Sequence, residues 1–351
     1  MHTNHYYNQL NKLQQRAYFN MKEGLEALAP SFYVPRLSGK ELAEIYFLVR
    51  LDNPEIFYST KFVWRYYDTS ENVEIVPDYM FEKKKIKEQQ QALETRVKKL
   101  ALPAEKLSDK DKLLYIHDFI CSNITYDKLK KAYSHEIIGA LGHGVAVCEG
   151  ISKTVKILCD RLNIPCVIAL AEANPEKGIK YRHAWNVVKI GGKQYHFDAT
   201  FDNSLGKDGQ IRYDYFCLPD KQIFRDHQPL VRPVPECTDG SAAYYLEKKL
   251  SFTKYEDVQK RSLQAAKKGK ILVFNWRGGY LTKEVLQDLV KIVNESGAEK
   301  GKKAAISVNW PQAVLQVKYE AMDAPLPEEA GEDGVVMQEA NEGELYGADE
   351  E

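Results

Sequence analysis

Residues 182–200 read RHAWNVVKIGGKQYHFDAT, and this stretch decides how we expect the centre of the chain to fold. Two runs with strand-forming composition flank Gly191 and Gly192. A two-residue glycine connection favours a tight antiparallel hairpin. We therefore predict strands over 182–190 and 194–200, with Ile190 facing Lys193 across the turn.

This register places several polar side chains on one face of the hairpin. His183 faces Thr200 and Trp185 faces Asp198, and all four share that face because side chains alternate along a strand. His183 and Asp198 are then diagonal neighbours, within reach of an imidazole–carboxylate hydrogen bond. Such a carboxylate selects one histidine tautomer and stabilises the imidazolium. The hairpin therefore predicts a His–Asp pair that needs only a nucleophile.

Cys148 is the candidate nucleophile. It follows the glycine-containing stretch LGHGVAV and opens a predicted helix over 148–162. Backbone N–H groups and the helix dipole at such a position lower the pKa of a thiol and can bind an oxyanion. Cys159 lies further along the same helix, where core packing explains it better. Cys121 falls within an earlier helix and Cys166 within a strand.

The segments VCEG, RHAWNVVKIGGKQYHFDATFD and YDYFCLPD occur in this order, and together they resemble the transglutaminase-like superfamily. The resemblance covers residues 108–228, about a third of the chain. It implies a papain-like fold with a catalytic triad. By this resemblance Cys148 is the nucleophile, His183 is the general base and acid, and Asp198 is the carboxylate that orients the histidine.

The same resemblance suggests further site residues. Trp185 and Asn186 occupy the HAWN positions of the family and are expected to line the site. We expect the amide of Cys148 to bind the oxyanion, together with a residue such as Tyr126. No metal ligand or cofactor is expected, since no two of the six cysteines show the C-x-x-C spacing.

Each of these residues also has a purely structural interpretation. Cys148 would then be a buried structural thiol, and His183 a strand histidine that bonds to a backbone group. Asp198 would be a cap on the turn that follows. The three residues in this order make the catalytic interpretation the stronger one.

We expect an α+β fold. Its core is papain-like or transglutaminase-like: a helix carrying the cysteine packs on an antiparallel sheet carrying His and Asp. Residues 1–105 should form a mostly helical region with a short strand pair, which we expect to be scaffold and which fits an extended bacterial form of the family. Residues 106–235 should form the catalytic core, 250–320 a small α/β unit and 323–351 an acidic, disordered tail.

Composition excludes several classes of protein. The 351 residues are 44% hydrophobic and 28% charged, as in a globular protein. The 49 basic residues nearly balance the 50 acidic ones, and no basic cluster points to nucleic acid. There is neither an apolar run long enough for a membrane span nor a signal-peptide pattern, so we expect a cytoplasmic protein. The oligomeric state is open.

The expected activity is acyl transfer through a thioester, with a protein or peptide as the substrate. Water as acceptor makes the protein a cysteine peptidase or amidase, which we favour. An amine acceptor makes it a transglutaminase. A non-catalytic protein-binding module is the other alternative. Peptide N-glycanase activity ranks lower, because members of that family usually carry paired C-x-x-C metal ligands.

Overall fold

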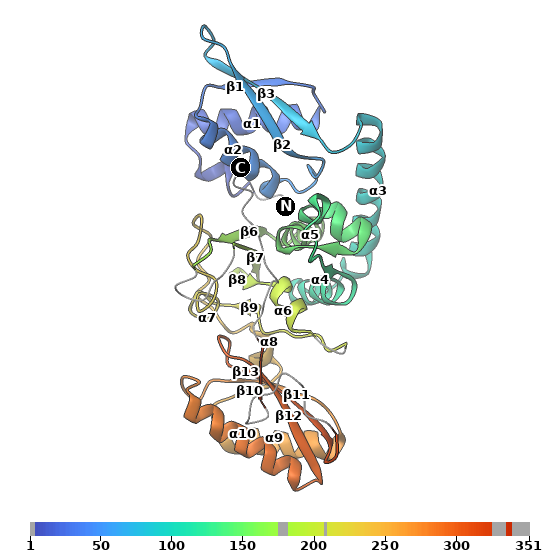
Figure 1. Cartoon of the computed structure of the whole chain (residues 1–351), viewed down its shortest axis with the longest axis vertical. Coiled ribbons are helices and arrows are strands. Elements are labelled where there is room, and N and C mark those ends of the chain that lie inside the picture. Colours follow the sequence, from blue (N-terminus) through green and yellow to red (C-terminus); the bar gives the residue numbers. More distant parts are fainter. Residues whose placement is uncertain (1–3, 175–181, 207–208, 325–334, 339–351) are drawn as a thin grey trace. The chain divides into compact units, whose positions relative to one another are not determined.

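The computed structural model describes residues 4–174, 182–206, 209–324 and 335–338 (Figure 1). The chain divides into two units, and each is described by itself. Unit 1 comprises residues 1–194, 229–235 and 343–351, and unit 2 comprises residues 195–228 and 236–342.

Serine side chains start two of the helices of unit 1. Ser38 accepts a hydrogen bond from the amide of Glu41, whose carboxylate accepts one from the amide of Ser38 in return. This reciprocal pair is a capping box. Ser108 likewise accepts from the amide of Asp111. The helices that open unit 1 are η1 (Tyr7–Gln9), α1 (Lys12–Glu26), α2 (Gly39–Asp52), α3 (Lys83–Ala101), η2 (Leu102–Ala104) and α4 (Asp109–Asn123).

A three-stranded antiparallel sheet accompanies these helices. It consists of β1 (Phe32–Pro35), β2 (Ser59–Tyr66) and β3 (Asn72–Tyr79), in the order β1-β3-β2. The sequence predicts the β2–β3 pair but not β1. The register of β2 shifts between Ser59 and Lys61, which makes a β-bulge at Thr60. β2 is an edge strand of this sheet.

The helix that begins at Cys148 is central to unit 1. This helix, α5, packs against β6 and β7, which pair antiparallel, and its other neighbours include α3 and α4 (Figure 1). Its buried face includes Ile151, Val155 and Leu158. Burial of one such side chain contributes about 1.5–3 kcal/mol. The elements here are β4 (Thr125–Tyr126), η3 (Ala132–His135), the π-helical turn η4 (Gly139–His143), β5 (Val145–Ala146), α5 (Cys148–Arg161), β6 (Cys166–Ala171) and β7 (His183–Ile190).

The turn predicted after β7 is present. Gly191 and Gly192 both have positive φ, at 57° and 80°. Two consecutive positive φ values are the signature of a type I′ hairpin turn, which glycine adopts without strain. The next strand, β8 (Lys193–Phe197), is shorter than expected: residues 199 and 200, predicted as strand, begin a helix instead.

Unit 2 contains a small antiparallel pair and a five-stranded sheet. Residues 196 and 197 of β8 pair with β9. The sheet has the order β10-β11-β13-β12-β14, and α9 and α10 pack side by side against it (Figure 1). The elements are α6 (Ala199–Leu205), β9 (Phe216–Leu218), α7 (Asp220–Ile223), α8 (Tyr244–Glu247), β10 (Ser251–Phe252), α9 (Tyr255–Lys268), β11 (Leu272–Trp276), α10 (Lys283–Ala298), β12 (Lys302–Asn309), β13 (Val314–Ala321) and β14 (Val335–Gln338).

β14 corrects part of the prediction for residues 323–351. The segment Val335–Gln338, expected within a disordered tail, pairs in parallel with β12. Val335 and Val336 are buried. The apolar pair interrupts the acidic composition and covers an edge of the sheet that β12 would otherwise leave unpaired.

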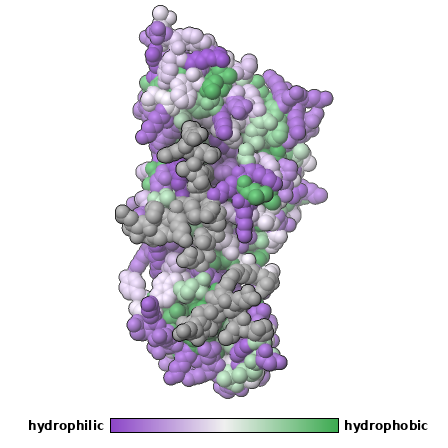
Figure 2. Space-filling model, in the orientation of Figure 1, coloured by the Kyte–Doolittle hydropathy of each residue, from purple (hydrophilic) through white to green (hydrophobic). Residues whose placement is uncertain are grey.

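None of the helices in the described ranges combines the length and the apolar character that crossing a membrane requires. On the face shown in Figure 2, hydrophilic residues predominate and hydrophobic ones form small separate patches.

Candidate active site

Cys148 is the first residue of α5, as the sequence predicts. The preceding residue, Val147, is extended, and its amide donates to the carbonyl oxygen of Ser134 at 3.0 Å. Before it, Gly144 adopts a left-handed conformation with φ 69° that ends η4. The glycine-containing stretch therefore turns the chain so that Cys148 stands at the N-terminal end of a helix, where the helix dipole favours a thiolate.

The glycine of the VCEG segment has a steric role. A Cβ atom at Gly150 would lie 2.2 Å from the carbonyl oxygen of Ser134, which belongs to the backbone of η3. Only a residue without a side chain allows the first turn of α5 to approach η3 this closely. Gly150 thus sets the position of the turn that carries Cys148.

His183 opens β7 and is paired with Ala171 of β6. Its ring is parallel to that of Trp185, with 5.7 Å between the centroids and 10° between the planes. His183 and Cys148 line one cavity of about 480 Å³. The structure of unit 1 thus brings the predicted nucleophile and the predicted base to a common space, although both side chains are largely buried.

The other expected site residues of unit 1, Trp185, Asn186 and Tyr126, are not among the described residues that line this cavity. Trp185 is fully buried against His183. The side-chain Nδ2 of Asn186 donates to the backbone carbonyl oxygen of Ser152 at 3.0 Å and so connects β7 to α5. Tyr126 lies on β4 and is paired with Ala146, two residues before Cys148.

Asp198 lies in unit 2, and there it is the N-cap of α6 rather than a strand residue. Its Oδ1 accepts hydrogen bonds from the amides of Thr200 at 2.9 Å and Phe201 at 3.1 Å. The prediction that strand alternation sets the direction of this carboxylate was wrong. An aspartate followed by helix-compatible residues caps a helix instead, because its oxygen satisfies amides that the helix leaves free. Its pairing with His183 stays a prediction.

A second histidine, His227, engages the same carboxylate. Its Nε2 lies 2.9 Å from Oδ2 of Asp198, and its Nδ1 lies 2.6 Å from Oδ1 of Asp226. Both ring nitrogens of His227 therefore lie within hydrogen-bond distance of a carboxylate oxygen. Sequence reasoning missed His227, because it lies 29 residues from Asp198 and follows no recognisable spacing.

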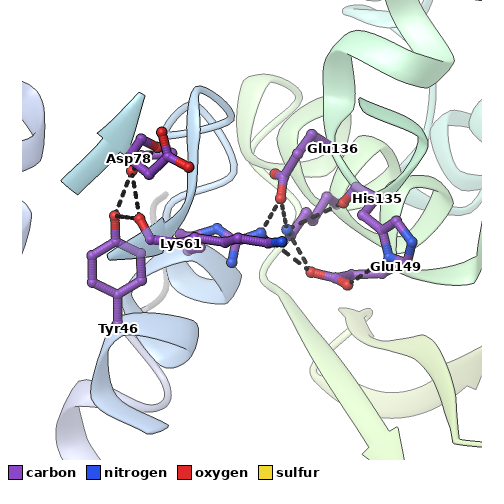
Figure 3. A network of polar contacts seen from close by, with 9 residues as sticks. Tyr46, Lys61, Asp78, His135, Glu136 and Glu149 are labelled. Carbon is purple, nitrogen blue, oxygen red and sulfur yellow. Dashed lines mark hydrogen bonds and ion pairs between the residues drawn. The ribbon is translucent and has the colours of Figure 1, made fainter. Parts of the chain in front are cut away.

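Unit 1 also holds a cluster of charged side chains that includes Glu149, the residue after Cys148. We call it the buried ionic cluster: Arg50, His135, Glu136, Glu149 and Lys153 (Figure 3). Lys153 contacts Glu136 at 2.8 Å and Glu149 at 2.7 Å. Arg50 of α2 bonds to Glu136 and lies 3.7 Å from Glu149. Nδ1 of His135 lies 3.2 Å from Glu149.

The cluster is internally balanced, with two carboxylates facing Arg50 and Lys153. Burial opposes ionisation of Glu149. The positive charges of Lys153 and Arg50 and a hydrogen bond from His135 favour ionisation and outweigh the effect of burial. They hold the pKa of the Glu149 carboxyl far below its usual range. Burial alone would lower the pKa of Arg50, but Glu136 and Glu149 raise it. Both groups therefore stay charged at neutral pH, right beside the candidate nucleophile.

Residues from the N-terminal region, 1–105, also line the cavity of Cys148 and His183. Phe47 and Arg50 come from α2, and Thr60 and Lys61 come from β2. The expectation that this region is only scaffold was wrong. Its composition gives no catalytic motif, and only the packing of α2 and β2 in unit 1 shows that they form part of the cavity wall.

Among the described residues of unit 2, one group has a geometry that could hold a metal ion: His196, Asp220 and Cys237, whose ligand atoms lie within 4.8 Å of one another. His196 Nε2 lies 2.7 Å from Asp220, and the amide of Cys237 donates to Asp220. Burial raises the pKa of the Cys237 thiol to about 12. These hydrogen bonds account for the group without a metal.

Comparison with known proteins identifies the class of the domain. Residues 97–199 match the family model of the transglutaminase-like superfamily, which confirms the predicted resemblance and the α+β class. This range includes Cys148, His183 and Asp198. The chain thus contains a transglutaminase-like domain.

Two solved structures are similar over part of the chain. One is described as a TGase, with 15% identity and a TM-score of 0.28 over 43% of this chain and 47% of the other. The second is described as a candidate cysteine protease from Cytophaga hutchinsonii, with 14% identity and a TM-score of 0.26 over 44% and 63%. The match spans less than two thirds of either relative. No curated protein matches this chain.

Proposed function

We propose that the protein is a thiol enzyme that cleaves peptide or amide bonds through a thioester intermediate. The observation that carries the proposal is that Cys148, at the N-terminal end of α5, and His183, at the start of β7, line the same cavity. The match of residues 97–199 to the transglutaminase-like superfamily supports it.

In the first half of the reaction, His183 takes the proton of the Cys148 thiol, and the thiolate attacks the carbonyl carbon. The resulting oxyanion accepts hydrogen bonds from the amide of Cys148 and from a group such as the Tyr126 hydroxyl. The intermediate collapses as the C–N bond breaks, and His183 gives its proton to the departing amine. A thioester on Cys148 remains.

In the second half, His183 takes a proton from water, whose oxygen attacks the thioester. The C–S bond breaks, a carboxylic acid leaves, and the proton returns to the sulfur. In this scheme Asp198 orients His183 and stabilises its charged form. An amine in place of water gives an amide instead, which is the transglutaminase outcome.

Thiol reactivity tests the proposal, and the structure supplies an internal control. Cys121 is partly exposed, while the other five cysteines are buried. Exposure alone therefore predicts that Cys121 reacts first with iodoacetamide, whereas an activated thiolate at about pH 6 predicts that Cys148 does. His183→Ala should abolish the selectivity for Cys148. Labelling in the order of exposure would favour a non-catalytic binding module.

The acceptor is tested with a casein-like protein and a fluorescent amine. Shorter casein fragments without incorporated fluorescence support hydrolysis. Incorporation without cleavage would show that the enzyme is a transglutaminase. Cys148→Ser serves as the blank for both readouts, because an oxygen replaces the sulfur with little change in volume.

A further inference from the structure

The walls of the Cys148 cavity carry an excess of positive charge. Three cations line the cavity besides Arg50: Lys61 from β2, Lys130 from the turn after β4, and Arg182 just before β7. The only carboxylate in the described lining is that of Glu149. Lys61 and Arg182 are exposed and Lys130 is partly exposed, so these lining residues are accessible to a substrate in the cavity.

The nearby carboxylates do not compensate the lysines. Glu149 and Glu136 are both taken up by Arg50 and Lys153 within the buried ionic cluster. Arg182 has its own partner, Glu172, at 2.6 Å. In the described part of the chain, neither Lys61 nor Lys130 forms an ion pair. Two uncompensated positive charges therefore remain at the cavity.

The backbone of β2 places Lys61 at the cavity. In a regular strand the side chains of Thr60 and Lys61 would point to opposite faces. The register shift between Ser59 and Lys61 interrupts this alternation, and both Thr60 and Lys61 line the cavity. Bulges of this kind re-aim side chains beside binding sites.

The backbone at Lys130 is also specialised. Lys130 has φ 50°, in the left-handed region that side-chain-bearing residues rarely adopt. Asp127 maintains the turn, because its carboxylate accepts hydrogen bonds from the amides of Leu129 and Lys131, both at 3.0 Å. The structure thus holds a lysine in the cavity wall at a position where a glycine would be less strained.

We propose that the cavity selects acidic peptide segments, in which glutamate or aspartate side chains flank the carbonyl that reacts. Lys61 and Lys130 are the specificity-determining residues, and each contacts a carboxylate of the bound segment. This deepens the proposed function by naming its substrate class, and it rests on that function only for the chemical step. Binding of the segment does not require a reactive Cys148.

Fluorescence polarisation on full-length Cys148→Ser protein tests the binding preference without turnover. The probes are a labelled glutamate-rich peptide and its counterpart with every glutamate replaced by glutamine. We expect tighter binding of the glutamate peptide, and a preference that shrinks as salt is added. Lys61→Met and Lys130→Gly should each weaken binding of the glutamate peptide about fivefold.

The variants are chosen to leave the backbone unchanged. Methionine nearly matches the lysine stem at position 61, and glycine adopts φ 50° at position 130 without strain. Lys87→Glu, at an exposed position of α3 outside the cavity lining, controls for the general charge of the chain and should leave the binding of both peptides unchanged. The glutamine peptide should bind all variants alike.

The outcomes separate this proposal from the proposed function. Equal binding of both peptides, or a preference that survives in the Lys61→Met, Lys130→Gly double variant, would refute the acidic specificity. A glutamate preference of the Cys148→Ser protein, together with no selective iodoacetamide labelling of Cys148 in the unsubstituted protein, would support the binding proposal and refute the enzymatic one.

Discussion

Replacing Lys153 by methionine tests the energetic role of the buried ionic cluster. Lys153 is completely buried and contacts both Glu136 and Glu149 within 3 Å. Methionine occupies nearly the same volume, so the substitution removes a charge while it leaves the packing almost intact. Arg50 is then the one arginine or lysine of the cluster that faces Glu136 and Glu149, so the charges of these three residues sum to minus one.

The expected loss is about 3–5 kcal/mol in the free energy of unfolding, which is typical when one partner of a buried ion pair is removed. Glu136→Gln in the same background restores the balance between Arg50 and Glu149. The double variant should therefore recover about 2 kcal/mol or more. Lys98→Met, which breaks the exposed pair with Glu94, should cost less than about 0.5 kcal/mol.

Urea unfolding followed by tryptophan fluorescence measures these differences, since Trp185 of unit 1 is fully buried. The pH dependence adds a second check. In Lys153→Met a carboxylate of the folded protein keeps its proton to higher pH than in the unfolded chain, so the deficit should shrink as pH falls from 8 towards 5. A loss below about 1 kcal/mol that does not change with pH would show that the cluster is not energetically coupled.

Three further substitutions test other parts of the structure. Gly150→Ala should cost about 1–3 kcal/mol in urea unfolding, because the new methyl group would meet the carbonyl oxygen of Ser134 at 2.2 Å. Glu149→Gln should make the free energy of unfolding, measured by urea titration, less dependent on pH in the acid range. The folded-state pKa of Glu149 is depressed, so its contribution is present above the unfolded value of about 4.3 and is lost as pH falls further. His227→Gln should lower kcat roughly tenfold and move the pH–rate profile, since His227 positions Asp198; an unchanged profile would contradict this role.

Short-range signals in the sequence were sufficient to predict where some helices begin and where one hairpin turns. A serine with an acidic residue three positions ahead is a local helix-start signal, and Ser38 and Ser108 begin α2 and α4 in this way, because the serine oxygen satisfies an amide three residues ahead. Gly191 and Gly192 predict the turn after β7 for a similar reason, since their backbone freedom acts within the turn itself. Cys148 at the start of α5 follows from the same kind of short-range reasoning.

Predictions over longer distances were less successful. Strand alternation did not extend to Asp198, because capping α6 satisfied its carboxylate better than the strand did. β14 was not predicted, because its few apolar residues become buried only when they pair with the edge of β12. Neither feature leaves a periodic pattern of its own.

The sequence by itself determined the class of domain and the order of Cys148, His183 and Asp198 along the chain, because those signals reside in short segments. Only the tertiary structure showed that α2 and β2 join Cys148 and His183 around one cavity. It also revealed the pairing of Arg50 with Glu136, 86 residues away. Such contacts depend on how distant elements pack, and a buried charge appears in a sequence as an ordinary surface residue until its partners are known.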